Sequence, residues 1–340
     1  MSAHRYTVLD GMRGIAAFAV FDRHLGGGFG LSHHMQHGYL AVDFFFALSG
    51  FVLAEAYDER LAKGMGFGAF FHRRCVRLYP MVLAGAVLGL LSFNPGWSGG
   101  RFELFMLDFA SASLLPLGLL FGQTTFPTNI PVWSLFFELF ANVVFFGLIR
   151  VRTLDAPKTV MLLLAAAAIL GAVAHLAGQI GAVGVNSVPS FLAGFVRVTL
   201  SFGAGVAISR FRCHVCCPVW PGWLVVLALA VLLAVPDCGW WYDMFCVACG
   251  FPLLLCLGAR AVSPMPTNRV WLWAGRVSYP LYVIQEPLLR AVFRLIGPGT
   301  GPALLAAGLT FMAAFLLLRF YDEPLRAWLA PARALSEPAL

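Results

Sequence analysis

An arginine and a histidine lie eleven residues apart in the first apolar stretch of the sequence. Arg13 and His24 both fall within residues 7–25. On a helix, eleven steps of about 100° come within roughly 20° of three turns, so both side chains point the same way, about 16 Å apart along the axis. An arginine inside a span costs on the order of 2.5–3.5 kcal/mol and normally faces a polar cavity, where a neutral histidine can act as general base. The alternative is that Arg13 only pairs with Asp10, three residues earlier.

A second group of basic residues precedes the third apolar stretch, in the sequence FFHRRCVRLYP. It contains Arg73, Arg74 and Arg77, of which the last two share a helical face because they are three residues apart. Such a cluster at a helix start suits a phosphorylated ligand, through paired hydrogen bonds and charge. The alternative is an anchor that contacts lipid phosphates.

Two acidic residues also lie within apolar stretches. Glu138 follows Ser134 by four residues in PVWSLFFELF, so the two share one side of a helix, and Asp43 lies in GYLAVDFFFALSGF. A carboxylate at such a depth is costly without a partner. Either it pairs with a histidine or arginine of another helix, or it contacts a substrate. Ser134 and the adjacent Trp133 are candidate donors to an oxyanion.

The elements that must position these residues are membrane helices. The chain has 340 residues, of which 60% are hydrophobic and only 11% charged, whereas a soluble domain has about 25% charged residues. We therefore predict an all-α integral membrane protein, a single polytopic domain over residues 1–340 without a cleavable signal peptide. The ten predicted spans lie near residues 7–25, 39–57, 76–93, 131–150, 159–177, 190–208, 222–236, 243–260, 272–293 and 303–320.

The basic residues are distributed unevenly between the two sides of this arrangement. With the N-terminus in the cytoplasm, 17 of the 23 Lys and Arg residues fall in inner segments, so both termini are predicted to be cytoplasmic. The net charge of +7 then reflects membrane orientation and not nucleic-acid binding. The stretch 104–121 is broken by Asp108 and Pro116, and a span there would invert all later segments. We predict that it is re-entrant or interfacial.

Two clusters of cysteine or histidine could in principle hold a metal ion. Residues 213–217 read CHVCC, but no second ligand pair follows at zinc-finger spacing, so we interpret them as reduced thiols at a helix end. Residues 33–37 read HHMQH and lie in a glycine-rich loop, where a helix is not expected. We predict no metal site, no disulfide framework and no bound cofactor.

The stretch LDGMRGIAAFAVFDRH resembles the opening motif of acyltransferase family 3, the membrane-bound O-acyltransferases of bacteria and some eukaryotes. Four further stretches resemble that family in order: GYLAVDFFFALSGFVL, FFHRRCVRLYP, PVWSLFFELF and VSYPLYVIQEPL. The terminal YDEPLRAWL is a weaker sixth. Together they extend from residue 9 to about 329, so the resemblance covers nearly the whole chain.

This resemblance implies transfer of an acyl group, usually acetyl, from cytoplasmic acyl-CoA as co-substrate to a hydroxyl group. The acceptor is expected to be a glycan, a lipid-linked sugar or a glycoconjugate, and the protein a multi-pass protein of the bacterial inner membrane. The acyl-CoA, the acceptor and membrane lipids are then its partners. The residues assigned in this way are His24 (the base) and Glu138 for catalysis, Arg13, Arg73, Arg74 and Arg77 for the donor, and Asp43, Trp133 and Ser134 for substrate.

Two stretches depart from the family's pattern and leave alternatives open. The family often has a histidine where this chain has Gln285, and the residues after Glu138 read LFANVVFF, without the usual polar or aromatic tail. The first departure leaves the acceptor open. A proton-coupled transporter with a relay of Arg13, His24 and Glu138 is the alternative function, although no repeated halves are visible. An intramembrane metalloenzyme would need a ligand set such as H-E-x-x-H, which the sequence lacks.

Overall fold

Helices form the regular elements of the protein, seen in a computed structural model that describes residues 6–92, 101–151, 155–181, 183–264 and 267–329. Within these residues, the β-type pairing consists of one isolated bridge between Pro221 and Val262. The α-helices are α1 (Thr7–Phe29), α2 (Ala41–Ala62), α3 (Phe67–Ser92), α4 (Arg101–Ala112), α5 (Val132–Val151), α6 (Ala156–Ala177), α7 (Val188–Arg210), α8 (Gly222–Ala234), α9 (Trp240–Phe245), α10 (Phe251–Arg260), α11 (Thr267–Ile296), α12 (Thr300–Leu317) and α13 (Glu323–Leu329). The 3₁₀ turns are η1 (Gly38–Leu40), η2 (Leu117–Phe121) and η3 (Cys213–Cys216), and the π-helical turns are η4 (Cys246–Gly250) and η5 (Leu318–Asp322).

The predicted spans coincide with these helices. Each range overlaps one helix or, for the eighth and the tenth, helices that continue through η4 or η5. By length and composition, seven helical segments of the described chain could cross a membrane. α1 and α11, which carry several charged residues, and α8, with 13 residues, fall outside that set. An all-helical, multi-span protein is thus confirmed, whereas ten spans and cytoplasmic termini stay predictions.

Local sequence signals fix the start of two of these helices. The Asp155 carboxylate accepts a hydrogen bond from the Lys158 backbone N–H (2.9 Å) ahead of α6, and Ser187 does the same for Ser190 (3.3 Å) ahead of α7. A proline follows in the first turn of each helix, where its missing N–H is not needed.

The third span begins earlier than the sequence predicts. The expected range is 76–93, but α3 starts at Phe67 and continues without a break through Pro80. The aromatic residues Phe67 and Phe71 stack on each other, with ring centroids 5.3 Å apart, and Phe67 also packs against Phe146 of α5. The basic cluster therefore lies in the second and third turns of α3 and not at its start.

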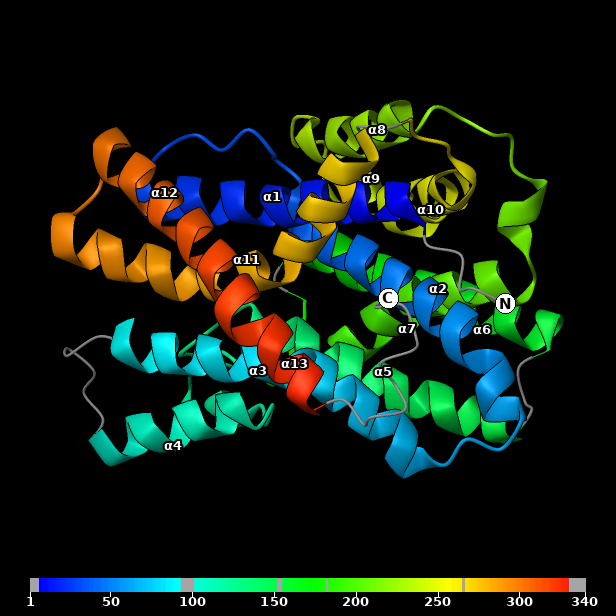
Figure 1. Cartoon of the computed structure of the whole chain (residues 1–340), viewed down its shortest axis with the longest axis horizontal. Coiled ribbons are helices and arrows are strands. Elements are labelled where there is room, and N and C mark those ends of the chain that lie inside the picture. The colour runs from blue at the N-terminus through cyan, green and yellow to red at the C-terminus, as the bar shows by residue number, and fades with distance from the viewer. Residues whose placement is uncertain (1–5, 93–100, 152–154, 182, 265–266, 330–340) are drawn as a thin grey trace.

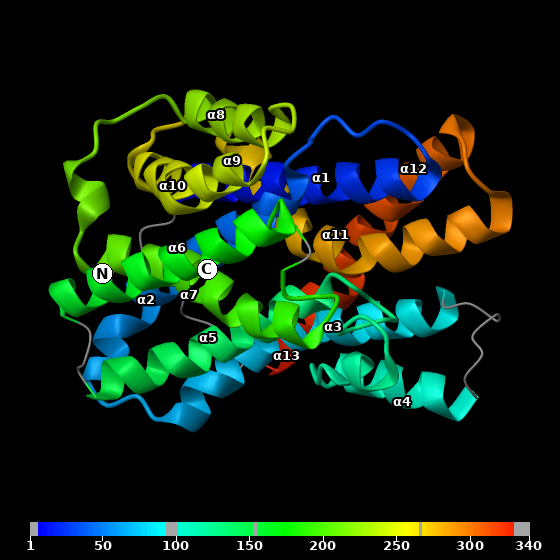
Figure 2. The same ribbon diagram turned by 180° about the vertical axis from the view of Figure 1, so that it is seen from behind.

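The segment 104–121 is built from α4 and η2. α4 has 12 residues and is therefore about 18 Å long, well short of the ~30 Å hydrocarbon core of a bilayer. It packs beside α3 (Figure 2). In the described residues, this segment does not form a further span.

Two groups of helices lie side by side, and α3 contacts members of both (Figures 1 and 2). One group contains α2, α5, α6 and α7, and the other contains α1, α8, α11 and α12. The carboxylate of Glu55 near the end of α2 joins them, accepting hydrogen bonds from the Tyr6 hydroxyl (3.3 Å) and from Ser209 of α7 (2.7 Å). We call this end of the bundle, where α1 and α11 begin and α2, α7 and α13 end, the basic end.

Glycines allow the site-bearing helices to approach closely. A Cβ on Gly205 of α7 would lie 1.9 Å from the Ala47 carbonyl oxygen of α2. Similarly, a Cβ on Gly14 of α1 would lie 2.6 Å from the Cβ of Ala274 in α11. Membrane helices gain much of their association energy from such close packing of small residues. The pairs α2–α7 and α1–α11 thus form tightly packed units.

Candidate active site

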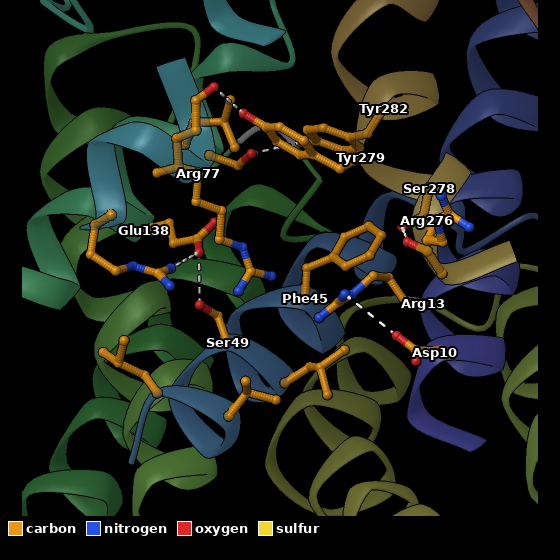
Figure 3. Close-up of a pocket in the computed structure, with 18 of the residues that line it drawn as sticks. Asp10, Arg13, Phe45, Ser49, Arg77, Glu138, Arg276, Ser278, Tyr279 and Tyr282 are labelled. Carbon is orange, nitrogen blue, oxygen red and sulfur yellow. Dashed lines mark hydrogen bonds and ion pairs between the residues drawn. The ribbon is translucent and has the colours of Figure 1, made fainter. Parts of the chain in front are cut away.

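A cavity of about 700 Å³ lies between the two helix groups (Figure 3). Its lining includes the first turns of α1 and residues of α13, which belong to the basic end. Residues of α1, α2, α3, α5, α11, η5 and α13 form its wall, and we call it the arginine pocket. Six arginines face three carboxylates there. The polar lining residues are Asp10, Arg13, Ser49, Arg73, Arg74, Arg77, Ser134, Glu138, Arg276, Ser278, Tyr279, Tyr282, Glu323 and Arg326.

Glu138 holds together two walls of the pocket. Its Oε1 accepts a hydrogen bond from Nη2 of Arg74 on α3 (2.9 Å) and another from the Ser49 hydroxyl of α2 (2.8 Å). Arg74 is almost completely buried, and its Nε has no partner in the described residues. This charge-assisted contact fixes Arg74 against α5, so its guanidinium keeps one orientation.

Arg77 differs from Arg74 in its surroundings. It lies one turn further along α3, and its side chain is directed into the pocket beside Glu138 and Phe45 (Figure 3). Within the described residues, its guanidinium makes no hydrogen bond or ion pair. Its nitrogens are open to the cavity, with the Glu138 carboxylate as a nearby opposite charge. The position therefore favours a ligand with negative charge.

Arg13 and Arg73 add positive charge to the same cavity. Nη1 of Arg13 lies 3.7 Å from Oδ1 of Asp10, one turn back on α1, and Arg73 lines the wall formed by α3. The Arg13–Asp10 pairing considered from the sequence thus exists, and it does not remove Arg13 from the pocket. All four arginines assigned to the donor line one cavity.

Ser134 and Tyr282 meet at the part of the pocket farthest from the basic end. Their hydroxyl oxygens are 2.7 Å apart, and each hydroxyl also lies within hydrogen-bond distance of the Pro131 carbonyl oxygen (3.0 and 3.2 Å). Phe45 packs edge-on against the Tyr282 ring. Each hydroxyl has one hydrogen, so it can donate to a polarised carbonyl oxygen of a ligand by turning away from Pro131 or from the other hydroxyl.

The wall of the pocket at the basic end comes from α11 and α13. Arg276 is paired with Glu323, and Arg326 is paired with Asp322 and lies over the Tyr279 ring, 5.6 Å from its centroid. None of these residues was assigned from the sequence. Except for Arg276, these residues lie in the family-like stretches VSYPLYVIQEPL and YDEPLRAWL, but spacing along the sequence does not reveal that they lie at one cavity with Arg77.

His24 lies outside the lining of the arginine pocket. It is three turns beyond Arg13 on α1, toward the end of the bundle opposite the basic end. Its Nδ1 is buried and has no hydrogen-bond partner among the described residues. A buried polar atom without a partner is rare in folded proteins, so this nitrogen is a position where a further hydrogen-bonding group would be accommodated.

Asp43 and Trp133 also lie outside the pocket lining, around a second buried ion pair. Asp43 and Arg197 of α7 are both fully buried, with Nη2 of Arg197 2.6 Å from Oδ2 of Asp43. Ser201 donates to the same carboxylate (3.1 Å), and the Arg197 guanidinium lies over the Trp133 ring, 5.3 Å from its centroid. The alternative of pairing with an arginine of another helix describes Asp43 in this structure.

The histidines and cysteines singled out in the sequence do not form a common cluster. His34 contacts Asp22 (3.4 Å), whereas the buried His37 contacts Asp243 (3.1 Å). In the part of the chain that the structure describes, no group of three or more His, Cys, Asp or Glu side chains is placed to hold a metal ion. All eight cysteines are free thiols.

Comparison with known proteins bears on the whole chain. The acyltransferase 3 family, described as "Acyltransferase domain", matches residues 6–319. A curated protein named "Protein 2 in picA locus", from Rhizobium radiobacter, is 39% identical over 156 residues, which cover 42% of this chain and 81% of that protein. No solved structure matches significantly. Because the family match spans nearly the entire sequence, this chain belongs to the acyltransferase 3 family and is a membrane acyltransferase with multiple helical spans.

Proposed function

We propose that this protein transfers an acyl group, in the first instance acetyl, from a cytoplasmic acyl-CoA to a hydroxyl group of an envelope or secreted glycan. The observation that supports this most strongly is Arg77, whose guanidinium makes no ion pair among the described residues and is directed into a cavity lined by six arginines and three carboxylates. Such an excess of positive charge around one cavity favours a polyanionic ligand. The diphosphate and the ribose phosphate of CoA supply that charge.

The reaction follows from the chemistry of a thioester. The acceptor oxygen attacks the carbonyl carbon of the donor, the carbon–oxygen bond forms, and the carbon–sulfur bond breaks to release CoA as the thiol. His24, whose Nδ1 is buried without a partner among the described residues, takes the proton of the acceptor hydroxyl and gives it to the departing sulfur. Ser134 and Tyr282 donate hydrogen bonds to the oxyanion that forms during the attack.

Glu138 has a positioning role in this mechanism. Its carboxylate holds Arg74 and Ser49, so it aligns the walls of α3 and α2 around the donor. Arg13, Arg73, Arg74 and Arg77 contact the donor phosphates, and the acyl end extends toward Ser134 and Tyr282. The acceptor reaches His24 from the opposite end of the bundle.

In this proposal the protein lies in the bacterial inner membrane, with the basic end in the cytoplasm. Acyl-CoA is a cytoplasmic metabolite, and the arginine pocket reaches the end of the bundle that carries the excess of Lys and Arg. The acceptor is a glycan, a lipid-linked sugar or a glycoconjugate on the other side. The protein thus transfers an acyl group across the membrane without transporting the donor.

The test is transfer of label from radiolabelled acetyl-CoA to the host's glycans in membranes that contain the protein. For Arg77→Ala we expect the KM for acetyl-CoA to rise at least about tenfold, because one charge-assisted hydrogen bond is worth about 1.5–3 kcal/mol. Arg150→Ala, at the exposed end of α5, is the matched control and should behave as wild type. Unchanged KM for Arg77→Ala contradicts the proposal, and collapse of a proton gradient without a covalent product favours the transporter instead.

A further inference from the structure

The last helix of the described chain lies beyond the family match but forms part of the arginine pocket. The match ends at residue 319, whereas α13 begins at Glu323. Glu323 and Arg326 nevertheless line the cavity, and α13 packs against α3 (Figure 1). The pocket is therefore completed by a helix that follows the matched residues and carries most of the YDEPLRAWL stretch, the weakest of the six resemblances.

The π-helical turn η5 sets the direction of α13. It covers Leu318–Asp322, directly before α13, and such turns change which side of a helix faces inward. Asp322 at its end is fully buried and accepts a hydrogen bond from Nε of Arg326 (2.8 Å). Glu323, the next residue, accepts one from Nε of Arg276 in α11 (2.9 Å). The two contacts hold α13 against the pocket.

One edge of the Arg326 guanidinium contacts a carboxylate, and the other edge can bind a ligand. Its Nε and Nη2 contact the carboxylate of Asp322, and the flat guanidinium lies over the Tyr279 ring. Tyr279 in turn donates its hydroxyl hydrogen to the Leu78 carbonyl oxygen (2.6 Å), so the ring is fixed. Within the described residues, Nη1 of Arg326 makes no hydrogen bond or ion pair, and the side chain is 32% exposed. A guanidinium oriented in this way binds phosphate oxygens in a defined geometry.

The order of groups along the pocket matches the order of groups along a CoA thioester. Along α11, which begins at the basic end, Arg276 precedes Tyr282 by six residues or about 9 Å. Arg276 and the α13 residues beside it therefore lie nearer the basic end than Tyr282 and Ser134 do. If the thioester lies beside the two hydroxyl groups, the adenosine with its 3′-phosphate lies beside α13. Arg77 of α3 lines the same cavity.

We propose that Arg326 binds the 3′-phosphate of the CoA donor and that α13 thereby makes this enzyme select CoA over dephospho-CoA. The inference rests on the proposed use of a CoA thioester. It assigns a specificity role to an element outside the family match. Asp322 and Tyr279 position the guanidinium, and the Arg276–Glu323 pair holds α13 over the adenosine end of the pocket.

The experiment measures binding of adenosine 3′,5′-bisphosphate and of adenosine 5′-monophosphate to the purified protein in detergent, by calorimetry. Wild type should bind the bisphosphate at least about tenfold more tightly, and Arg326→Gln should lose that preference. Arg269→Gln is the control, because this arginine is exposed on α11 and does not line the pocket. A preference that survives in Arg326→Gln, or one that is absent in wild type, overturns the proposal.

Two additions keep the test decisive. Arg326→Gln leaves the buried Asp322 carboxylate without its partner, so a variant that fails to accumulate is replaced by the double variant Asp322→Asn with Arg326→Gln, which removes both charges. Transfer from acetyl-CoA and from acetyl-dephospho-CoA is then compared. If wild type uses both donors equally, the 3′-phosphate site is wrong and the proposed function stands. If the bisphosphate binds through Arg326 but no acetyl group is transferred, the 3′-phosphate site stands and the proposed function is wrong.

Discussion

Replacing Glu138 by glutamine tests both the stability of the pocket and the place of the donor. The change keeps the size of the side chain and one acceptor oxygen, but it removes the charge that compensates Arg74. Arg74 is 5% exposed and Glu138 is 18% exposed, at an N···O distance of 2.9 Å. The perturbation is therefore electrostatic, with little loss of packing.

The expected magnitude follows from this burial. Removing one partner of a fully buried pair costs about 3–5 kcal/mol because the other charge is left uncompensated. Since one edge of Glu138 faces the cavity, solvent screening reduces this cost. We therefore expect the free energy of unfolding to fall by about 2–3 kcal/mol. Ser49→Ala removes only the second hydrogen bond to the same oxygen and should cost about 1 kcal/mol.

The donor should reverse much of this loss. If CoA phosphates lie beside Arg74, they supply the missing negative charge, and a ligand that binds only the folded state stabilises it. CoA at about 100 times its Kd adds about 2.7 kcal/mol to any two-state protein. At the same absolute CoA concentration the gain for Glu138→Gln should be larger by about 1–2 kcal/mol, because the ligand also compensates Arg74 and therefore binds this variant with a lower Kd.

Thermal unfolding of the purified protein, followed by the fluorescence of its nine tryptophans, gives both quantities. The melting temperature of each variant is measured with and without CoA, with Ser49→Ala as the matched control. Two results refute the reasoning. A loss for Glu138→Gln no greater than for Ser49→Ala means that the ion pair is unimportant, and an equal CoA-induced shift in wild type and Glu138→Gln means that the donor does not reach Arg74.

Three further predictions concern residues away from the pocket lining. His24→Ala should abolish acetyl transfer but leave the Kd for CoA unchanged within about twofold, as measured by calorimetry, because His24 does not line the pocket. Asp43→Asn should lower the free energy of unfolding by about 3–5 kcal/mol, with an unchanged KM in the folded fraction, because it leaves Arg197 buried and uncompensated. Gly205→Ala should prevent close α2–α7 packing and lower the yield of folded protein in size-exclusion chromatography, whereas Gly147→Ala, with open space around it, should not.

The helices could be predicted from hydropathy, and their ends could be predicted only in part. A run of apolar residues is enough to indicate α6 or α12, because these helices are mostly exposed on the outside of the bundle and carry few charges. The start of α3 at Phe67 could not be predicted in the same way, since its first two turns are stabilised by aromatic contacts with Phe146, which is distant in sequence. The π-helical turn before α13 has no hydropathy signal at all.

The candidate site could be predicted as a set of residues but not as a set of pairs. Periodicity places Arg74 and Arg77 on one face, and membrane cost marks Glu138 and Asp43 as residues that need partners. Which partner each one takes depends on tertiary contacts. Glu138 pairs with Arg74, 64 residues away, and Asp43 pairs with Arg197, 154 residues away. Spacing within one helix carries no information about either choice.

The charge of the arginine pocket explains why residues that look unfavourable in sequence are retained together. The six arginines of one cavity repel one another in the absence of a ligand. Three of them pair with the carboxylates of the lining and Arg326 pairs with Asp322, so more arginines than carboxylates still face the cavity. Natural sequences violate local rules mainly where function requires it. A polyanionic donor removes the excess on binding, so part of its affinity comes from relief of repulsion already present in the empty protein. The same excess makes the unliganded form the less stable one.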